Sequence, residues 1–266
     1  MKSKKRIGLA LGSGGWRGLA HIGVIKSLSK HGYRISAIAG SSAGALIGGL
    51  YSLYGDYLEI ENIFQNLKFK DLLYVFSDPS GSYGLIKGNK TLSLLQRYCQ
   101  NALIENLKIP YKAVATDLMM GEQYIFEEGD LAQAIRASSS IPIIFDPVKF
   151  DSRYLVDGAL VNPLPIDVVK SMNVDVIIAV NIYNCIFPVL KPNVKFKSLG
   201  VAMLSYQCML NKYALILGEG ADILVQPSLE NSFSDPFLQF INNSKAIDQG
   251  ETAMDAYIST LERLIY

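Results

Sequence analysis

Several residue types are scarce in this chain of 266 residues, and each scarcity excludes a class of protein. Cys99, Cys185 and Cys208 are too few and too scattered for a disulfide framework or for a zinc site of the CxxC type. Charged residues make up 18% of the chain and the formal net charge is +1, so no excess of positive charge favours binding to nucleic acid. We therefore expect a protein of the reducing cytoplasm that does not bind nucleic acid.

Acidic residues are missing altogether between Gly12 and Asp56. A dinucleotide-binding turn of the G-x-G-x-x-G type needs an acidic residue about twenty positions later to bind the ribose. Arg17 also stands where the third glycine of that pattern would be. NAD and FAD are therefore excluded as expected ligands, and we predict neither a cofactor nor a metal ion.

Histidine is almost absent, because the chain contains only His21 and His31. Both precede the glycine- and serine-rich turn at 40–44, whereas the triad of an α/β-hydrolase places its histidine after the nucleophile. We expect His21 to be a structural residue of the first helix and His31 to lie at a solvated helix end. A nucleophilic serine in this chain would need a different base.

One stretch without charged residues, 35–55, is long enough to cross a bilayer. It contains five glycines and four serines, and this composition is more typical of a buried strand, a tight turn and a buried helix. The basic cluster at residues 2–6 is followed by a glycine-rich turn instead of the apolar segment of a signal peptide. We therefore expect a soluble protein.

Apolar residues, in contrast, make up half of the chain, and short β-branched runs alternate with helical patterns along its length. This alternation predicts one α/β domain over residues 1–266 with a largely parallel sheet. We expect strands at 7–11, 35–39, 111–115, 123–126, around 151–153, at 174–180 and at 222–226. We expect helices at about 19–28, 45–54, 56–70, 90–107, 131–137 and 246–265, with a lid or rim at 78–88.

The turn Gly40-Ser41-Ser42-Ala43-Gly44 fits the pattern G-x-S-x-G between a predicted strand and a predicted helix. A nucleophile on such a turn needs small neighbours, and the helix N-terminus stabilises negative charge that develops there. A plain glycine-rich turn would read the same way, so the pattern by itself leaves both interpretations open.

A second glycine turn, Gly12-Ser-Gly-Gly-Trp-Arg-Gly18, ends the first predicted strand and begins a helix. Adjacent parallel strands would bring both turns to the same edge of the sheet. The backbone N–H groups of Gly14, Gly15 and Trp16 would then point at an ester carbonyl held over Ser42 and form an oxyanion hole.

Three blocks together resemble the signature blocks of patatin-like phospholipases: residues 11–24, the turn at 40–44, and Asp157-Gly158-Ala159. The stretches 134–142 and 162–165 are similar to the bacterial and neuropathy-target-esterase branch of that family. The resemblance covers about residues 7–170 and leaves 171–266 as a C-terminal extension. It implies a three-layer α/β/α fold with a mainly parallel central sheet.

The resemblance also implies an activity, because in that family a Ser–Asp dyad hydrolyses acyl esters of lipids without histidine. Carried over by position, Ser42 is the nucleophile and Asp157 is the general base, while Arg17 supports the oxyanion turn of Gly14, Gly15 and Trp16. The implied reaction releases fatty acid from phospholipid or lysophospholipid. A carboxylate is a weaker base than imidazole, so positioning must supply more of the acceleration.

Two residues depart from the family pattern: Ser13 stands where glycine is usual, and Trp16 replaces a commonly small residue. They leave two alternatives open, a small-ester or acyl-CoA thioesterase with the same dyad and a catalytically weak lipid-binding regulatory protein. As partners we expect a lipid ester and a transient contact with a membrane surface through 72–76 and 186–190. We expect Asp117 and Glu122 to flank a solvated hairpin, and Ser138, Ser139 and Ser140 to form a helix end near the site.

Overall fold

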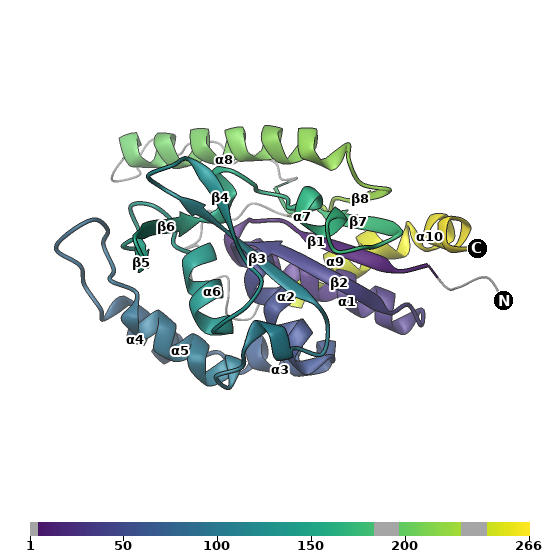
Figure 1. Ribbon diagram of the computed structural model, residues 1–266, viewed down its shortest axis with the longest axis horizontal. Coiled ribbons are helices and arrows are strands. Elements are labelled where there is room, and N and C mark those ends of the chain that lie inside the picture. Colours follow the sequence, from purple (N-terminus) through teal and green to yellow (C-terminus); the bar gives the residue numbers. More distant parts are fainter. Residues whose placement is uncertain (1–4, 184–196, 230–243) are drawn as a thin grey trace.

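The computed structural model describes residues 5–183, 197–229 and 244–266 (Figure 1). Its centre is a mixed sheet of β1 (Ile7–Leu11), β2 (Ile35–Ser41), β3 (Tyr111–Asp117), β4 (Glu122–Phe126), β5 (Val148–Phe150), β6 (Arg153–Asp157), β7 (Val176–Val180) and β8 (Ile223–Val225). The strands are ordered β5-β6-β3-β2-β1-β7-β8, and β4 also pairs with β3. Strands β3, β2, β1, β7 and β8 run parallel, whereas β4, β5 and β6 form antiparallel pairs at one side.

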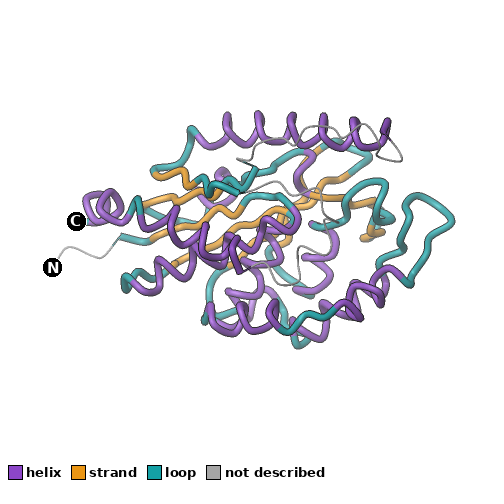
Figure 2. Tube along the Cα trace, turned by 180° about the vertical axis from the view of Figure 1, so that it is seen from behind, coloured by secondary structure: helices purple, strands orange, loops and turns teal. Residues whose placement is uncertain are grey.

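Helices cover both faces of this sheet (Figures 1 and 2). They are α1 (Leu19–Lys30), α2 (Ala43–Tyr54), α3 (Tyr57–Gln65), α4 (Phe69–Phe76), α5 (Asn89–Cys99), α6 (Leu131–Ser138), α7 (Ile166–Lys170), α8 (Lys197–Gly218), α9 (Ser244–Asp255) and α10 (Ile258–Ile265). Side chains alternate between the two faces of a strand. In β1, Leu9 and Leu11 therefore join the core under α1, α2 and α9, and Ala10 joins the core under α7 and α8. The predicted three-layer α/β/α fold is confirmed.

Three predicted helices are shorter than expected or are broken. The segment 56–70 is divided into α3 and α4, because Lys68 is extended. The helix expected at 90–107 ends at Cys99, since Gln100 and Asn101 both have positive φ angles. The helix expected at 246–265 is divided into α9 and α10. Apolar spacing continues across each break, which is why the sequence pattern did not reveal them.

The charge-free stretch 35–55 forms β2 and the 12-residue helix α2. Within the described ranges, no helix is both long enough and apolar enough to span a membrane.

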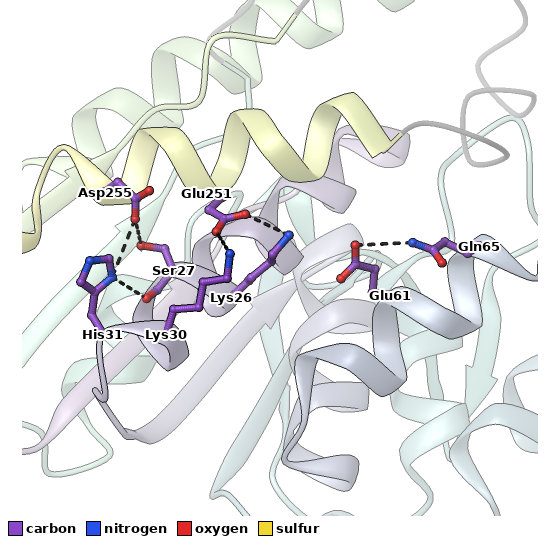
Figure 3. Close-up of polar contacts among 8 residues, drawn as sticks. All are labelled: Lys26, Ser27, Lys30, His31, Glu61, Gln65, Glu251 and Asp255. Atoms are coloured by element: carbon purple, nitrogen blue, oxygen red, sulfur yellow. Dashed lines mark hydrogen bonds and ion pairs between the residues drawn. The ribbon is translucent and has the colours of Figure 1, made fainter.

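Helices α1 and α9 cross in direct contact, although they lie at opposite ends of the chain (Figure 3). Glu251 of α9 pairs with Lys26 at 2.9 Å and with Lys30 at 2.5 Å. One turn further along, the Ser27 hydroxyl donates to Asp255 at 2.5 Å. His31 lies at the exposed carboxyl end of α1, as predicted. These polar contacts border the crossing and fix its register.

The crossing depends on two glycines, because a glycine of each helix lies against the backbone of the other helix. A Cβ atom on Gly23 would lie 1.9 Å from the carbonyl oxygen of Ile247. We expect Gly23→Ala to lower the free energy of unfolding by about 2–3 kcal/mol, because the helices must separate. Denaturant unfolding measures the change. Gly81→Ala, where no atom lies within 4 Å of the added Cβ, is the control. Equal stability of Gly23→Ala and the control would contradict this crossing.

Candidate active site

Strand β3 brings Ser42 and Asp157 together, although they are far apart in the chain. The first half of β3 pairs with β2, and the last pair is Ser41 with Val114. Immediately beyond it β6 pairs with β3, beginning with Asp157 opposite Ala115. β4 pairs with β3 from Ala113 to Asp117, and this stretch overlaps both the β2 and the β6 pairing. Because β4 occupies the other edge there, β2 and β6 share one edge and meet end to end. The serine turn and the aspartate therefore lie at the same point of the sheet.

The two side chains are joined directly. The Ser42 hydroxyl donates to Asp157 Oδ2 at 2.7 Å, and the Ala159 N–H donates to the other oxygen, Oδ1, at 2.9 Å. Thr116 donates through its hydroxyl to the Asp157 backbone oxygen at 2.8 Å. Ser42 is 4% exposed and Asp157 is 2% exposed. The carboxylate is thus held in one orientation, with one oxygen fixed to the backbone and the other directed at the serine.

Burial also changes the basicity of this carboxylate. Burial raises the pKa of Asp157 to about 6, against the opposing effect of the hydrogen bonds from Ser42 and Ala159. At pH 7 the carboxylate is still mostly ionised, and it is a stronger base than an ordinary aspartate. Its environment therefore suits it to accept a proton near neutral pH.

Ser42 lies on a sharp turn between β2 and α2, with φ of 54° and ψ of −116°. A residue with a Cβ atom is strained in this region. The turn also requires its flanking glycines: a Cβ on Gly40 would lie 2.3 Å from the Gly44 carbonyl oxygen, and one on Gly44 would lie 2.0 Å from that of Leu11. The small residues of the G-x-S-x-G pattern are thus explained by close backbone contacts.

The carboxyl end of α6 supports both candidate residues. The Ser42 backbone N–H donates to Ser138 Oγ at 2.9 Å, and that hydroxyl donates to the Val114 carbonyl at 2.6 Å. The Asp157 backbone N–H donates to the Ser140 carbonyl at 3.0 Å. The predicted position of these serines, at a helix end beside the site, is confirmed.

The glycine turn after β1 lies against the serine turn, because β1 and β2 are adjacent and parallel as predicted. A Cβ on Gly18 would lie 2.7 Å from the Ala43 side chain, so the two turns touch. Gly15 has a φ of 61° and open space around its Cβ position. Within the described part of the chain, the N–H groups of Gly14 and Gly15 have no hydrogen-bond acceptor. These donors remain free to bind an anionic oxygen.

The two residues that depart from the family pattern are accommodated without filling this turn. The buried Ser13 hydroxyl lies 3.0 Å from Tyr183 Oη and so points toward Tyr183. Trp16 is part of the apolar core. The Arg17 guanidinium lies over the Trp16 ring and donates to the Gly14 carbonyl at 3.5 Å. The arginine thus touches the turn that it was expected to support.

His21 is a structural residue, as predicted. It is fully buried, and burial lowers its pKa to about 4, so the ring is neutral at pH 7. Its Nε2 lies 2.8 Å from the Gly12 carbonyl oxygen, which can only accept a hydrogen bond. His21 therefore holds the start of the glycine turn.

Tyr206 of α8 is a residue near the site that sequence reasoning missed. Its hydroxyl is buried and has no hydrogen-bond partner within the described residues. Burial first, and then the negative charge of Asp157, raise the pKa of Tyr206 above its ordinary value. The helical pattern of α8 gave no signal for this, because a buried tyrosine on an apolar helix face usually belongs to the core.

The interpretation of Asp117 as part of a solvated hairpin was wrong. Asp117 and Glu122 do flank the β3–β4 turn, but Asp117 is buried and forms an ion pair of 2.6 Å with Arg153. The ion pair fixes β6 beside β3. Elsewhere in the described ranges, no group of three or more His, Cys, Asp or Glu residues is placed to hold a metal ion.

Gly158 tests how closely the site depends on the β3–β6 junction. A Cβ atom there would lie 2.1 Å from the Val114 carbonyl oxygen and 2.8 Å from Ser41 Oγ. We expect Gly158→Ala to displace Asp157 and to lower any ester hydrolysis at Ser42 about 100-fold, since a shift of about 1 Å has this effect on positioned groups. Steady-state kinetics, with circular dichroism to verify folding, measures the loss. Unchanged turnover would show that the junction tolerates a side chain.

Comparison with known proteins relates this chain to one family through a family model and through individual relatives. The family model of patatin-like phospholipases matches residues 9–170. An uncharacterized NTE family protein of Mycobacterium tuberculosis is 41% identical over 180 residues, which are 68% of this chain and 50% of that protein. A patatin-like phospholipase domain-containing protein of Caenorhabditis elegans is 33% identical over 189 residues, covering 66% of this chain and 13% of that protein. The chain thus spans half of the mycobacterial relative and a smaller part of the nematode one.

Among solved structures, VipD from Legionella pneumophila superimposes with a TM-score of 0.61 at 12% sequence identity, covering 97% of this chain and 67% of VipD. At this identity the likeness concerns the fold alone. The family match covers more than half of the chain and includes both glycine turns and Asp157. This chain therefore belongs to the patatin-like phospholipase family.

Proposed function

We propose that this protein is a serine hydrolase that releases fatty acid from phospholipid or lysophospholipid, with Ser42 as the nucleophile and Asp157 as the general base. One observation carries the proposal: the 2.7 Å hydrogen bond from the Ser42 hydroxyl to a buried carboxylate, at a strained strand-to-helix turn. Membership of the patatin-like phospholipase family supports the lipid as the class of substrate.

In the first step, Ser42 Oγ attacks the ester carbonyl carbon while its proton passes to Asp157 Oδ2. The N–H groups of Gly14, Gly15 and Trp16 stabilise the negative oxygen of the tetrahedral intermediate. The intermediate collapses as the C–O bond to the alcohol breaks, and Asp157 returns the proton to the leaving oxygen. The result is an acyl group on Ser42 and a free alcohol.

In the second step, water attacks the acyl carbon and Asp157 takes a proton from that water. The second tetrahedral intermediate releases fatty acid, and the proton returns to Ser42. One carboxylate thus serves both halves of the reaction, and its raised pKa favours both accepting and returning the proton near pH 7.

A fluorophosphonate probe, which labels activated serines, tests the nucleophile directly. We expect the wild-type protein to be labelled and to release fatty acid from mixed micelles of phospholipid and lysophospholipid, and we expect Ser42→Ala to do neither. Labelling of Ser42→Ala would show that another residue is the nucleophile. Turnover of short soluble esters without turnover of lipid would indicate a small-ester hydrolase. Lipid binding with neither labelling nor turnover would indicate a regulatory lipid binder.

A further inference from the structure

One end of the molecule exposes large apolar side chains. α4 and the loop that follows it lie at the end opposite the two termini (Figures 1 and 2). α4 buries none of its residues, and Phe69 and Leu73, one turn apart, are both exposed. We call five exposed side chains of α4, the following loop and the segment after α6 the apolar rim: Phe69, Leu73, Tyr83, Leu85 and Ile143. The other segment predicted to touch a membrane, 186–190, lies outside the described residues.

Backbone hydrogen bonds join the loop of the apolar rim to the segment after α6. The Leu85 N–H donates to the Ile143 carbonyl at 2.9 Å, and the Ile86 N–H donates to the Ile144 carbonyl at 2.9 Å. Leu85 and Ile143 are therefore neighbours in space. Tyr83, whose N–H donates to Asp146, belongs to the same hydrogen-bonded unit, and α4 leads directly into its loop. These exposed side chains are therefore not scattered single residues.

Arg136 connects this unit to the candidate active site. Its buried guanidinium donates to the Gly88 carbonyl at 3.2 Å and to the Lys87 carbonyl at 2.9 Å. It also donates to the hydroxyl of Ser140, the residue whose carbonyl accepts the Asp157 N–H. The apolar rim is thus held at a fixed position relative to the candidate dyad.

Ile143 combines two unfavourable features. Its φ angle is 75°, in the left-handed region that a β-branched residue rarely adopts. Its side chain is nevertheless 50% exposed, so burial in the core does not compensate for the strain. Strain of this kind clusters at functional sites. An apolar contact outside the chain would explain why isoleucine occupies this position.

The negatively and positively charged side chains around the apolar rim have different environments. The three carboxylates of these segments all accept hydrogen bonds from the local backbone: Asp71 from Lys68, Asp78 from Asn89 and Lys90, and Asp146 from Tyr83 and Gly84. Lys68, Lys70 and Lys87 are exposed, and no described carboxylate forms an ion pair with them. The three carboxylates are half-buried, whereas the three lysines are exposed. The exposed charges among these residues are therefore positive, which complements a negatively charged surface.

We propose that the apolar rim, with Lys68, Lys70 and Lys87 at its border, docks this protein on the surface of a bilayer that contains anionic phospholipid. The proposal rests on the proposed function, because the bilayer would present the lipid ester. Apolar side chains enter the boundary between headgroups and acyl chains, and lysines bind the anionic headgroups. The connection through Arg136 and Ser140 then holds the dyad close to that surface.

Vesicle co-sedimentation of the full chain carrying Ser42→Ala tests docking without catalysis. The vesicles contain phosphatidylcholine alone or phosphatidylcholine with phosphatidylserine. We expect stronger binding to the anionic vesicles, a loss of about tenfold on Leu85→Ser, and a loss of more than tenfold on the double variant Lys70→Glu, Lys87→Glu. Ile216→Ser, in the last turn of α8, is the matched control, because Ile216 and Leu85 are each 65% exposed.

Ile143→Asn separates docking from damage to the fold, because asparagine tolerates the left-handed region and is polar. We expect its thermal midpoint to equal or exceed that of the parent and its vesicle binding to fall about tenfold. Equal binding of Leu85→Ser and Ile216→Ser to the vesicles would overturn the proposal. It would also be overturned if the protein did not bind vesicles but formed a dimer that the Leu85→Ser substitution dissociates. Hydrolysis of a soluble ester by Leu85→Ser with Ser42 intact reports on the proposed function separately. If Leu85→Ser still hydrolyses the soluble ester while no variant binds vesicles, the docking proposal is wrong and the proposed function stands.

Discussion

Replacing Asp157 with asparagine is expected to lower ester hydrolysis by about 10³-fold, because the amide cannot accept the Ser42 proton. The loss should not come from misfolding, since asparagine has nearly the same shape and can still accept the Ala159 N–H. Wild-type activity should also rise with pH through about 6, where the Asp157 carboxylate ionises, and should level off above it. Initial rates between about pH 4 and pH 8, roughly two units on either side of that pKa, measure both effects.

The same substitution should stabilise the protein above pH 6. The folded-state pKa of Asp157 is raised from 3.8 to about 6, so the native state binds this proton more tightly than the unfolded state does. The free energy of unfolding of the wild-type protein therefore increases as the pH falls through 6. Above pH 6 the ionised carboxylate is unfavourable in the folded state. At about 1.4 kcal/mol per pKa unit, Asp157→Asn should raise the free energy of unfolding relative to wild type by as much as about 3 kcal/mol at pH 8, and should not change it below about pH 4. A substitution that is inactive and destabilising at pH 8 would contradict the buried, ionised base.

Ser42→Gly and Ser42→Ala are both expected to lower activity by at least about 10⁴-fold, because each removes the nucleophile. Their stabilities should differ, since the φ of 54° at position 42 strains any residue that has a Cβ atom. Glycine relieves this strain and alanine keeps it, so Ser42→Gly should be more stable than Ser42→Ala by about 1 kcal/mol after the entropy cost of glycine.

Denaturant unfolding of the two variants at one pH measures this difference, and activity toward a soluble ester verifies that both are inactive. Equal stabilities would show that the turn relaxes when the serine is removed. Residual activity in both variants would contradict Ser42 as the nucleophile.

The residue pattern predicted one α/β domain with a largely parallel sheet and the adjacency of the two glycine turns, because β-branched runs and glycine spacing report on local structure. The three layers were implied by the resemblance to a family. The flanking residues of Ser42 could be predicted for the same reason, since the contacts of Gly40 and Gly44 follow from the turn itself. Asp157 could not be assigned in this way. Asp157-Gly158 reads as an ordinary turn, and the resemblance to a family singled it out.

The structural features that the sequence could not reveal depend on pairing between distant segments. No local pattern indicates that β6 follows β2 along the same edge of β3, or that Tyr206 of α8 lies within the field of Asp157. The burial of Asp117 beside Arg153 has the same origin, because the arginine comes from another strand. The positive φ angle of Ile143 was also hidden, because no local pattern indicates that its carbonyl accepts the Leu85 N–H from the loop after α4.

The meeting of β2 and β6 on β3 has a consequence for the chain during synthesis. Ser42 and Asp157 are 115 residues apart, and β3 must be in place before either strand end has its neighbour. Pairings over such sequence separations form late, since their loop-closure entropy is lost before any contact compensates for it. A chain still emerging from the ribosome therefore carries the serine turn without Asp157, the proposed base. Recovery of labelling by a serine-reactive probe during refolding should follow the slowest of these long-range pairings, so Ser42 would become reactive only once β6 has paired with β3.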